Sequence, residues 1–302
     1  GGSIVAHTLE SFFGLTVTLK LAGFIFAMGL AFCVWYGTNL VGRLSTILIF
    51  GMLISFLLSI QGFLLHVEIE ALLDSRPEYT IFILAAIPYF MTSFGYHGCV
   101  PSLVKYYSSD AKKVRHCLLF GSLLALVFYL LWLVATLGNI PRDDFNAISS
   151  TGGNIGDLVK TLGGKTDNTY ISNTLAIFAN MAVVSSFLGV TLGLFDFVAD
   201  KFDFSDDSLG RSKSAIFTFL PPTVAGIFFP NGFIYAIGLA GMFACIFGSI
   251  VPAVTAKNSR IRFGSPHYQV WGGSYLLTLI ICYGTLQFFC FVGTSINLLP
   301  KY

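Results

Sequence analysis

Residues 79–108 form an apolar run long enough to cross a membrane, yet Gly95, Gly98 and Pro101 fall within seven positions of it. A glycine costs a helix about 1 kcal/mol relative to alanine, and an interior proline costs about 3 kcal/mol. Proline also moves the preceding residue out of the helical region. We therefore predict two half-helices, 79–94 and 101–108, on either side of an unwound segment. In lipid, a break is tolerated only against protein or a water-filled cavity, and secondary transporters use such breaks to bind substrates.

Apolar segments of membrane-spanning length recur along the chain. About 20 apolar residues are needed to cross the hydrocarbon core of a bilayer. Hydrophobic residues make up 55% of the chain and charged residues 11%, whereas a soluble protein carries about 25% charge. We predict an all-α membrane protein with a single transmembrane domain over 1–302. Eight spans are expected near 16–36, 43–66, 79–108 (broken), 114–137, 171–199, 214–229, 231–255 and 273–298.

Lysine and arginine are distributed unevenly among the segments that join these spans. One alternating set of segments carries eleven of them and the opposite set carries five. Cytoplasmic loops are enriched in Lys and Arg, so the richer set is expected to face the cytoplasm. That set includes 105–116, 201–213 and 257–272, and the long 138–170 segment then faces outward.

Two segments outside the spans have simpler patterns. Within 138–170, residues 155–162 are amphipathic, and we predict a short helix there with Gly153 or Asn154 at its start. Residues 1–14 are weakly apolar and are expected to form a helix end or a loop. The net charge of +2, without a basic tract, argues against a nucleic-acid partner. The six scattered cysteines include no CxxC pair, so neither a metal site nor a disulfide is expected.

His97 is the candidate of greatest chemical interest, because it lies inside the predicted break at membrane depth. Ionisable residues at this depth are functional by default, and an unperturbed histidine titrates near a pH of about 6.5, which suits proton exchange. The alternative is a histidine that neighbouring backbone groups satisfy and that only stabilises the break. The first turn of the second half-helix, at Pro101 and Ser102, offers N–H groups to a carboxylate. The predicted substrate-binding residues are Ser93, Phe94, Gly95, Tyr96, His97 and Gly98.

The 171–199 span carries a second group of candidates. Small and polar residues recur there every three or four positions, which places them on one helix face. Gly189 and Gly193 on this face predict close packing against a neighbouring helix. Ser185 and Ser186 could present hydroxyls to a cation or a water, and Asp196 is either a salt-bridge partner at the helix end or part of an exit path for ions. Together with His97, the coupling-ion candidates are Ser185, Ser186 and Asp196.

Several longer motifs resemble the aromatic amino acid permeases of bacteria, the tryptophan- and tyrosine-specific carriers of the amino acid/auxin permease superfamily. The resemblance runs over essentially the whole chain. The motifs that carry it are Thr92–Gly98 with Val100–Ser102, Trp132–Pro141, Ser185–Asp196, Phe219–Pro222, Phe229–Phe233, Phe263–Pro266 and Val270–Gly273.

The resemblance implies a helical bundle of the leucine-transporter type, with a discontinuous helix and a five-plus-five inverted repeat. It also implies proton-coupled uptake. The eight spans correspond to helices four to eleven of the family pattern, so the first three, including the first broken helix, are missing. The chain starts Gly1-Gly2-Ser3 without an initiator methionine. We therefore expect a C-terminal part of a longer carrier, with only part of the substrate site.

The sequence thus predicts a proton symporter for tryptophan or tyrosine in the bacterial inner membrane, not an enzyme. The expected partners are the aromatic amino acid and membrane lipid, with no obligate protein partner. No cofactor is expected, and the coupling ion is a proton, with sodium left open. Two alternatives remain: a passive channel or facilitator for a small polar solute, and a membrane scaffold in which the breaks only shape packing. The preference among tryptophan, tyrosine and phenylalanine, the proton site and the oligomeric state are left open.

Overall fold

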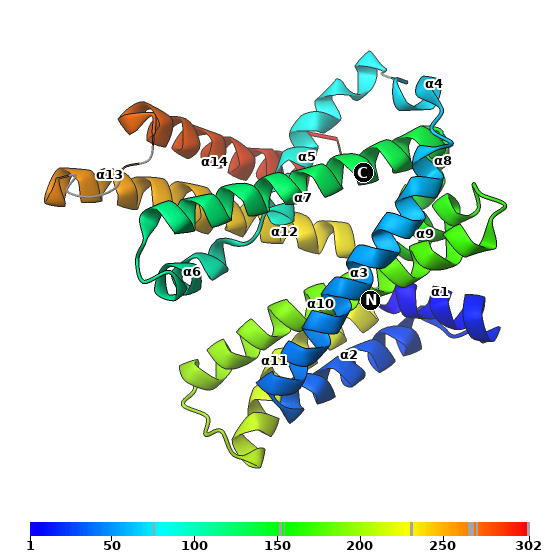
Figure 1. Ribbon diagram of the computed structural model, residues 1–302, viewed down its shortest axis with the longest axis horizontal. Coiled ribbons are helices and arrows are strands. Elements are labelled where there is room, and N and C mark those ends of the chain that lie inside the picture. Colours follow the sequence, from blue (N-terminus) through cyan, green and yellow to red (C-terminus); the bar gives the residue numbers. More distant parts are fainter. Residues whose placement is uncertain are drawn as a thin grey trace. The chain divides into compact units, whose positions relative to one another are not determined.

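The structure is a computed structural model that describes residues 1–74, 76–150, 153, 155–229, 232–264, 269 and 271–300. Over these residues the regular secondary structure is helical throughout and contains no β-strand, as the sequence predicts. The chain divides into two compact units. Unit 1 comprises Gly1–Asp74 and Leu131–Phe233, and unit 2 comprises Ser75–Leu130 and Ile234–Tyr302. The ribbon is shown in Figure 1.

The helices of unit 1 are α1 Gly2–Phe13, α2 Leu19–Tyr36, α3 Thr38–Leu64, α4 Ile69–Leu72, α8 Asp144–Ser150, α9 Ile155–Gly163, α10 Thr169–Lys201 and α11 Ser208–Phe228. Helix α7, Ala111–Asn139, runs from unit 2 into unit 1. The helices of unit 2 are the 3-10 turn η1 Pro77–Tyr79, α5 Thr80–Ser93, the 3-10 turn η2 His97–Cys99, α6 Val100–Tyr106, α12 Phe233–Cys245, the π-helical segment η3 Ile246–Ile250, α13 Val251–Phe263 and α14 Gly273–Ser295.

Among the described residues, seven helical stretches are long and apolar enough to cross a membrane. Five of them are single continuous helices, and one contains the π-helical segment η3. The seventh is the interrupted stretch that holds α5 and α6. They are Leu19–Tyr36, Thr38–Leu64, Pro77–Tyr106, Ala111–Asn139, Thr169–Lys201, Phe233–Phe263 and Gly273–Ser295. The expected span 214–229 lies largely in α11, which is not one of the seven, so its membrane crossing stays a prediction. The cytoplasmic and outward assignments of the loops also stay predictions.

Unit 1 is organised around α10, which packs against α3 and α11 (Figure 1). Its hydrophobic core brings together residues from α2, α3, α10 and α11. Gly62 of α3 leaves no room for a side chain, because a Cβ atom there would overlap the δ-methyl of Ile171 in α10. The close approach of these two helices therefore depends on a glycine of α3. The buried core residues are Phe26, Leu30, Val34, Val41, Leu188, Phe195 and Phe219.

The prediction that Gly189 and Gly193 of α10 mediate close helix packing was wrong for the described part of the chain. A Cβ atom at either glycine would meet no described atom within 4 Å. Residues three or four apart share a helix face, but the spacing does not say which neighbour lies against that face. The close contact with α3 lies elsewhere on α10, at Ile171 and Met181.

The joint between α2 and α3 is a single residue, Gly37. Its φ of 152° is one that residues with a side chain rarely adopt, so glycine is required for this turn. Arg211 of α11 stabilises the end of α2: its guanidinium donates hydrogen bonds to the carbonyls of Trp35 (2.8 Å) and Val34 (2.9 Å). A cation at a helix C-terminus satisfies free carbonyls and the helix dipole together. The same guanidinium pairs with Asp206 at 2.7 Å.

Three segments differ from, or extend, the sequence expectations. Residues 2–13 form a full helix, α1, rather than a helix end or loop. The predicted amphipathic helix at 155–162 is confirmed as α9, and the expected capping residue Asn154 lies outside the described residues. The helix predicted at 231–255 continues to Phe263, because the charged residues after 256 mark the end of the apolar run and not the end of the helix.

Candidate functional site

The broken helix lies where the sequence predicts it. Helix α5 ends at Ser93, the next three residues are not helical, and the 3-10 turn His97–Cys99 leads into the seven-residue helix α6. Neither Gly95 nor Gly98 has a positive φ. The two glycines therefore act through their low helix propensity and not through a left-handed conformation.

The break leaves backbone groups without partners. The N–H groups of Phe94, Gly95 and Tyr96 are bonded to the carbonyls of Met91, Thr92 and Phe94. Among the described residues, by contrast, the N–H groups of His97 and Gly98 and the carbonyl of Gly95 have no hydrogen-bond partner. Gly95 and Gly98 are exposed, and His97 is half-buried. The break thus presents two adjacent donors and one acceptor.

Helix α7 holds both sides of the break. The Tyr129 hydroxyl donates to the Ser93 carbonyl at 2.5 Å, and the Tyr129 ring meets the Phe94 ring edge to face, with centroids 5.4 Å apart. Seven residues earlier, on the same face of α7, the Ser122 hydroxyl lies 2.8 Å from the Tyr96 hydroxyl. A carbonyl freed at the end of α5 is therefore satisfied by a side chain of α7.

His97 packs against the π-helical segment Ile246–Ile250, which we call the π-segment. A Cβ atom on Gly248 would lie 2.8 Å from His97 Nε2 and 2.6 Å from the methyl of Met91. The imidazole also stacks on the ring of Tyr96, with an interplanar angle of 3° and centroids 5.5 Å apart. His97 is half-buried, with Tyr96 stacked on its ring and Gly248 close to Cε1 and Nε2.

The π-segment was not predicted from the sequence. Its cause is Pro252, which lies near the start of α13 and has no N–H group for a regular helical bond to Gly248. A π-turn accommodates such a residue inside a long helix, and π-turns are frequent at functional sites. A proline, Pro252, within the predicted span 231–255 was the signal that could have located it. Ser122 and Tyr129 lie seven positions apart in one predicted span, so their hydroxyls share a helix face. That spacing was the signal that could have located the α7 contacts.

The six predicted substrate residues lie together in unit 2, and the remaining candidates lie in unit 1. Ser185 donates its hydroxyl to the Ala182 carbonyl of its own helix at 3.1 Å. Ser186 and Asp196 are exposed on α10. Among the described residues no group of three or more His, Cys, Asp and Glu side chains is placed to hold a metal ion. The roles of all these residues in substrate or ion binding stay predictions.

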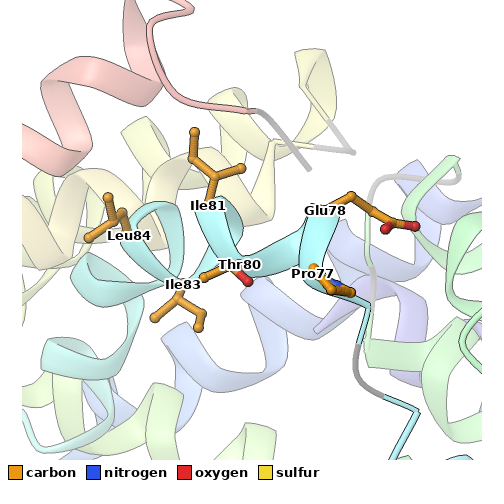
Figure 2. Close-up of a pocket in the computed structure, with 6 residues that line it drawn as sticks. All are labelled: Pro77, Glu78, Thr80, Ile81, Ile83 and Leu84. Carbon is orange, nitrogen blue, oxygen red and sulfur yellow. The ribbon is translucent and has the colours of Figure 1, made fainter.

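A shallow hollow at the start of α5 does not belong to this site (Figure 2). It is lined by neighbouring residues of one helical stretch, and Figure 2 shows Ile81 and Ile83 pointing to opposite sides of that helix. Its lining is mostly apolar, which suits contact with lipid. The lining residues are Pro77, Glu78, Thr80, Ile81, Ile83 and Leu84.

The chain is similar to known transport proteins over its full length. It is 47% identical over 305 residues to a tryptophan-specific transport protein of Pseudomonas aeruginosa, covering 100% of this chain and 73% of that protein. It is 39% identical over 306 residues to a low affinity tryptophan permease of Escherichia coli (100% of this chain, 74% of that protein). It is 38% identical over 307 residues to a tyrosine permease of Enterobacter agglomerans (99% and 74%).

No solved structure matches the chain, so the inverted repeat of the leucine-transporter type stays an expectation. The model of the tryptophan/tyrosine permease family matches residues 1–291, which include the broken helix, the π-segment and nearly all of α14. With this match and these relatives, the chain belongs to the tryptophan/tyrosine permease family.

Proposed function

We propose that the chain belongs to a permease that takes up tryptophan or tyrosine across the bacterial inner membrane. The relatives described above are named for this activity, and the all-α, multi-span structure suits a carrier rather than an enzyme. The observation that carries the proposal is the unpaired backbone at the break, formed by the N–H groups of His97 and Gly98 and the carbonyl of Gly95.

These groups match the two ends of an amino acid. A carboxylate accepts hydrogen bonds, so the two adjacent N–H groups of His97 and Gly98 suit it. An ammonium group donates, so the Gly95 carbonyl suits it. Charge-assisted hydrogen bonds of this kind are about twice as strong as neutral ones. The break therefore recognises the backbone that all amino acids share, and it does not by itself select a side chain.

Aromatic side chains around the break offer a surface for the substrate ring. Phe94 and Tyr129 lie edge to face, and Tyr96 stacks on His97. Aromatic pairs favour offset or edge-to-face contacts with centroids 4.5–7 Å apart, each contributing about 0.5–1.5 kcal/mol. An indole or phenol ring can extend either of these pairs. This arrangement supports an aromatic rather than an aliphatic substrate.

Coupling to protons is the further part of the proposal, with His97 on the proton path. The histidine is half-buried, lies in a stretch long and apolar enough to cross a membrane, and adjoins the unpaired backbone. Protonation there would change the charge beside a bound carboxylate, which links the two binding events. Membrane lipid is the remaining partner, and the proposal requires no obligate protein partner and no cofactor.

Uptake by cells tests the proposal. The gene is expressed in bacteria that lack aromatic amino acid permeases, and accumulation of labelled tryptophan and tyrosine is measured. Accumulation above the external concentration, abolished by a protonophore and insensitive to removal of sodium, is expected. Equilibration without accumulation would support a passive facilitator instead. Equal uptake of leucine or alanine would contradict the aromatic substrate class.

A further inference from the structure

Gln287 is a buried polar side chain that the candidate site does not use. It lies in α14, one of the membrane-spanning helices, and only 1% of its surface is exposed. Neither its amide oxygen nor its amide nitrogen has a hydrogen-bond partner among the described residues. Both ends of the same amide therefore lack a partner.

Such an arrangement is energetically costly. An amide taken out of water without a replacement hydrogen bond destabilises the folded protein. In high-resolution structures, buried side-chain polar atoms are mostly bonded to protein or to ordered water. The hydrocarbon core of a bilayer contains no water that could bond to the amide. The hydrogen-bond partner of Gln287 must therefore be held inside the protein.

The neighbours of Gln287 locate the partner. Gly284 lies one turn earlier on the same face of α14, and a Cβ atom there would lie 3.1 Å from Ser249 Cβ and 2.8 Å from Ile250 Cγ1 of the π-segment. Side chains of a helix lean toward its N-terminus. The Gln287 side chain therefore leans toward Gly284, whose neighbours are in the π-segment.

Ser249 is the second polar side chain at this contact. It is 7% exposed, and its hydroxyl makes a long hydrogen bond, 3.9 Å, to the sulfur of Met91 in α5. Sulfur is a weak acceptor, and the hydroxyl oxygen keeps its own acceptor capacity. The Gln287 amide therefore has unused donor and acceptor capacity, and the nearby Ser249 hydroxyl has unused acceptor capacity.

We propose that Gln287 and Ser249 form a buried site for one ordered water molecule. Water both donates and accepts, so a single molecule can serve the two ends of an amide and a hydroxyl, and buried waters typically make about three such bonds. A cation is disfavoured, because Ile250 and the Cys245 carbonyl are the other close neighbours of Gly284 and no carboxylate is among them. The site adjoins the candidate substrate site, since Gly248, the residue before Ser249, contacts His97.

Thermal unfolding of the purified carrier without substrate is the first test. Gln287→Leu and Ser249→Ala are each expected to lower the Tm, because each leaves the water and the other side chain incompletely bonded. The double variant is expected to lose less than the sum of the two, because the residues share one water. A higher Tm for Gln287→Leu would show that the amide has no partner, and additive losses would show that no molecule is shared. Either result overturns the proposal. Cys290→Ala, another buried position of α14, controls for lost packing.

Nuclear magnetic resonance observes the water directly. The chain has three glutamines, Gln61, Gln269 and Gln287, so selective labelling of glutamine side-chain amides gives few signals. The signal that disappears in Gln287→Leu is expected to show a cross-peak to water that persists in detergent and in lipid. Absence of that cross-peak overturns the proposal.

Transport measurements distinguish water from the other possible ligand of Gln287. That other ligand is the polar ring atom of a substrate, which offers the same hydrogen-bonding chemistry. In Gln287→Leu, the KM values for tryptophan, tyrosine and phenylalanine are expected to change by the same factor. A rise for tryptophan and tyrosine that spares phenylalanine, which has no polar ring atom, would make the substrate the ligand of Gln287 and overturn the water site. The unfolding and resonance experiments do not depend on transport, so they stay decisive if the proposed function fails.

Discussion

Gly248 of the π-segment lies directly against the imidazole of His97, with room for a hydrogen atom but not for a methyl group. A Cβ atom at position 248 would lie 2.8 Å from both Cε1 and Nε2 of the ring. The imidazole and the Met91 methyl are the free ends of side chains, so a larger residue displaces them rather than the backbone. Gly248 therefore fixes the position of His97 at the break.

Replacement of Gly248 tests this contact. Gly248→Ala is expected to reduce the proton-driven accumulation of tryptophan severalfold, because the ring of His97 must move from its place on the proposed proton path. Gly121→Ala in α7 is the matched control, because a Cβ atom there meets no described atom within 4 Å. Equal accumulation by the two variants, at equal abundance in the membrane, would contradict the positioning role of Gly248.

Removal of one hydroxyl tests the support that α7 gives to the break. Tyr129→Phe keeps the edge-to-face contact with Phe94 and removes the donor to the Ser93 carbonyl. One such hydrogen bond contributes about 1 kcal/mol, so a loss of about fivefold in substrate affinity is expected. Binding of tryptophan to the purified carrier measures it. Tyr283→Phe, at an exposed tyrosine of α14, should bind like the wild type, and a similar loss there would mean that the effect is not specific.

The break and the positions of most helices could be predicted from the sequence, because both depend on local properties. Gly95, Gly98 and Pro101 act on the helix in which they lie, and apolar length gives the spans without knowledge of neighbours. The contacts that build the site could not be predicted in the same way. Tyr129 and Ser93 are 36 positions apart, and Gly248 and His97 are 151 positions apart, so no periodicity in the sequence joins them. The same reason explains the error at Gly189.

The contact of α3 with α10 distinguishes two glycines that the sequence alone does not separate. Gly62→Ala is expected to destabilise the protein by about 1–3 kcal/mol, because the new methyl group overlaps Ile171, whose branched side chain has little freedom to move. Gly189→Ala has no described neighbour within 4 Å and should not lower stability. Thermal unfolding in detergent compares the two. A larger loss for Gly189→Ala would restore the packing role expected from the sequence.

The start of α11 predicts a dependence of stability on pH. Asp207 caps this helix: its carboxylate accepts a hydrogen bond from the Gly210 N–H at 2.7 Å and another from the Ser205 hydroxyl at 2.7 Å. These bonds lower the pKa of Asp207, the Gly210 contact most. A lowered pKa means that the stabilisation is present above the ordinary pKa of aspartate and is lost as the pH falls through the pKa of the folded state.

Asp207→Asn isolates this contribution, because asparagine also caps helices but carries no charge. At neutral pH the variant is expected to have a lower Tm than the wild type, and the difference should shrink as the pH is lowered through the acidic range. Asp203→Asn, in the same loop, is the control. A Tm difference that stays constant with pH would mean that the charge of Asp207 does not contribute.

His97 gives the prediction on which proton coupling depends. The imidazole stacks on Tyr96 and lies against Gly248, and within the described part of the chain the N–H groups of residues 97 and 98 have no partner. The backbone donors remain after His97→Ala, so substrate binding and exchange across the membrane should be retained. A titratable group is removed, so accumulation driven by a proton gradient should be lost. Counterflow of labelled tryptophan measures exchange, and uptake from pH 5.5 to 8 measures accumulation. The control is His116→Ala, which replaces an exposed histidine of α7. If His97→Ala accumulates tryptophan like the wild type across this pH range, His97 only stabilises the break, and coupling must depend on another group.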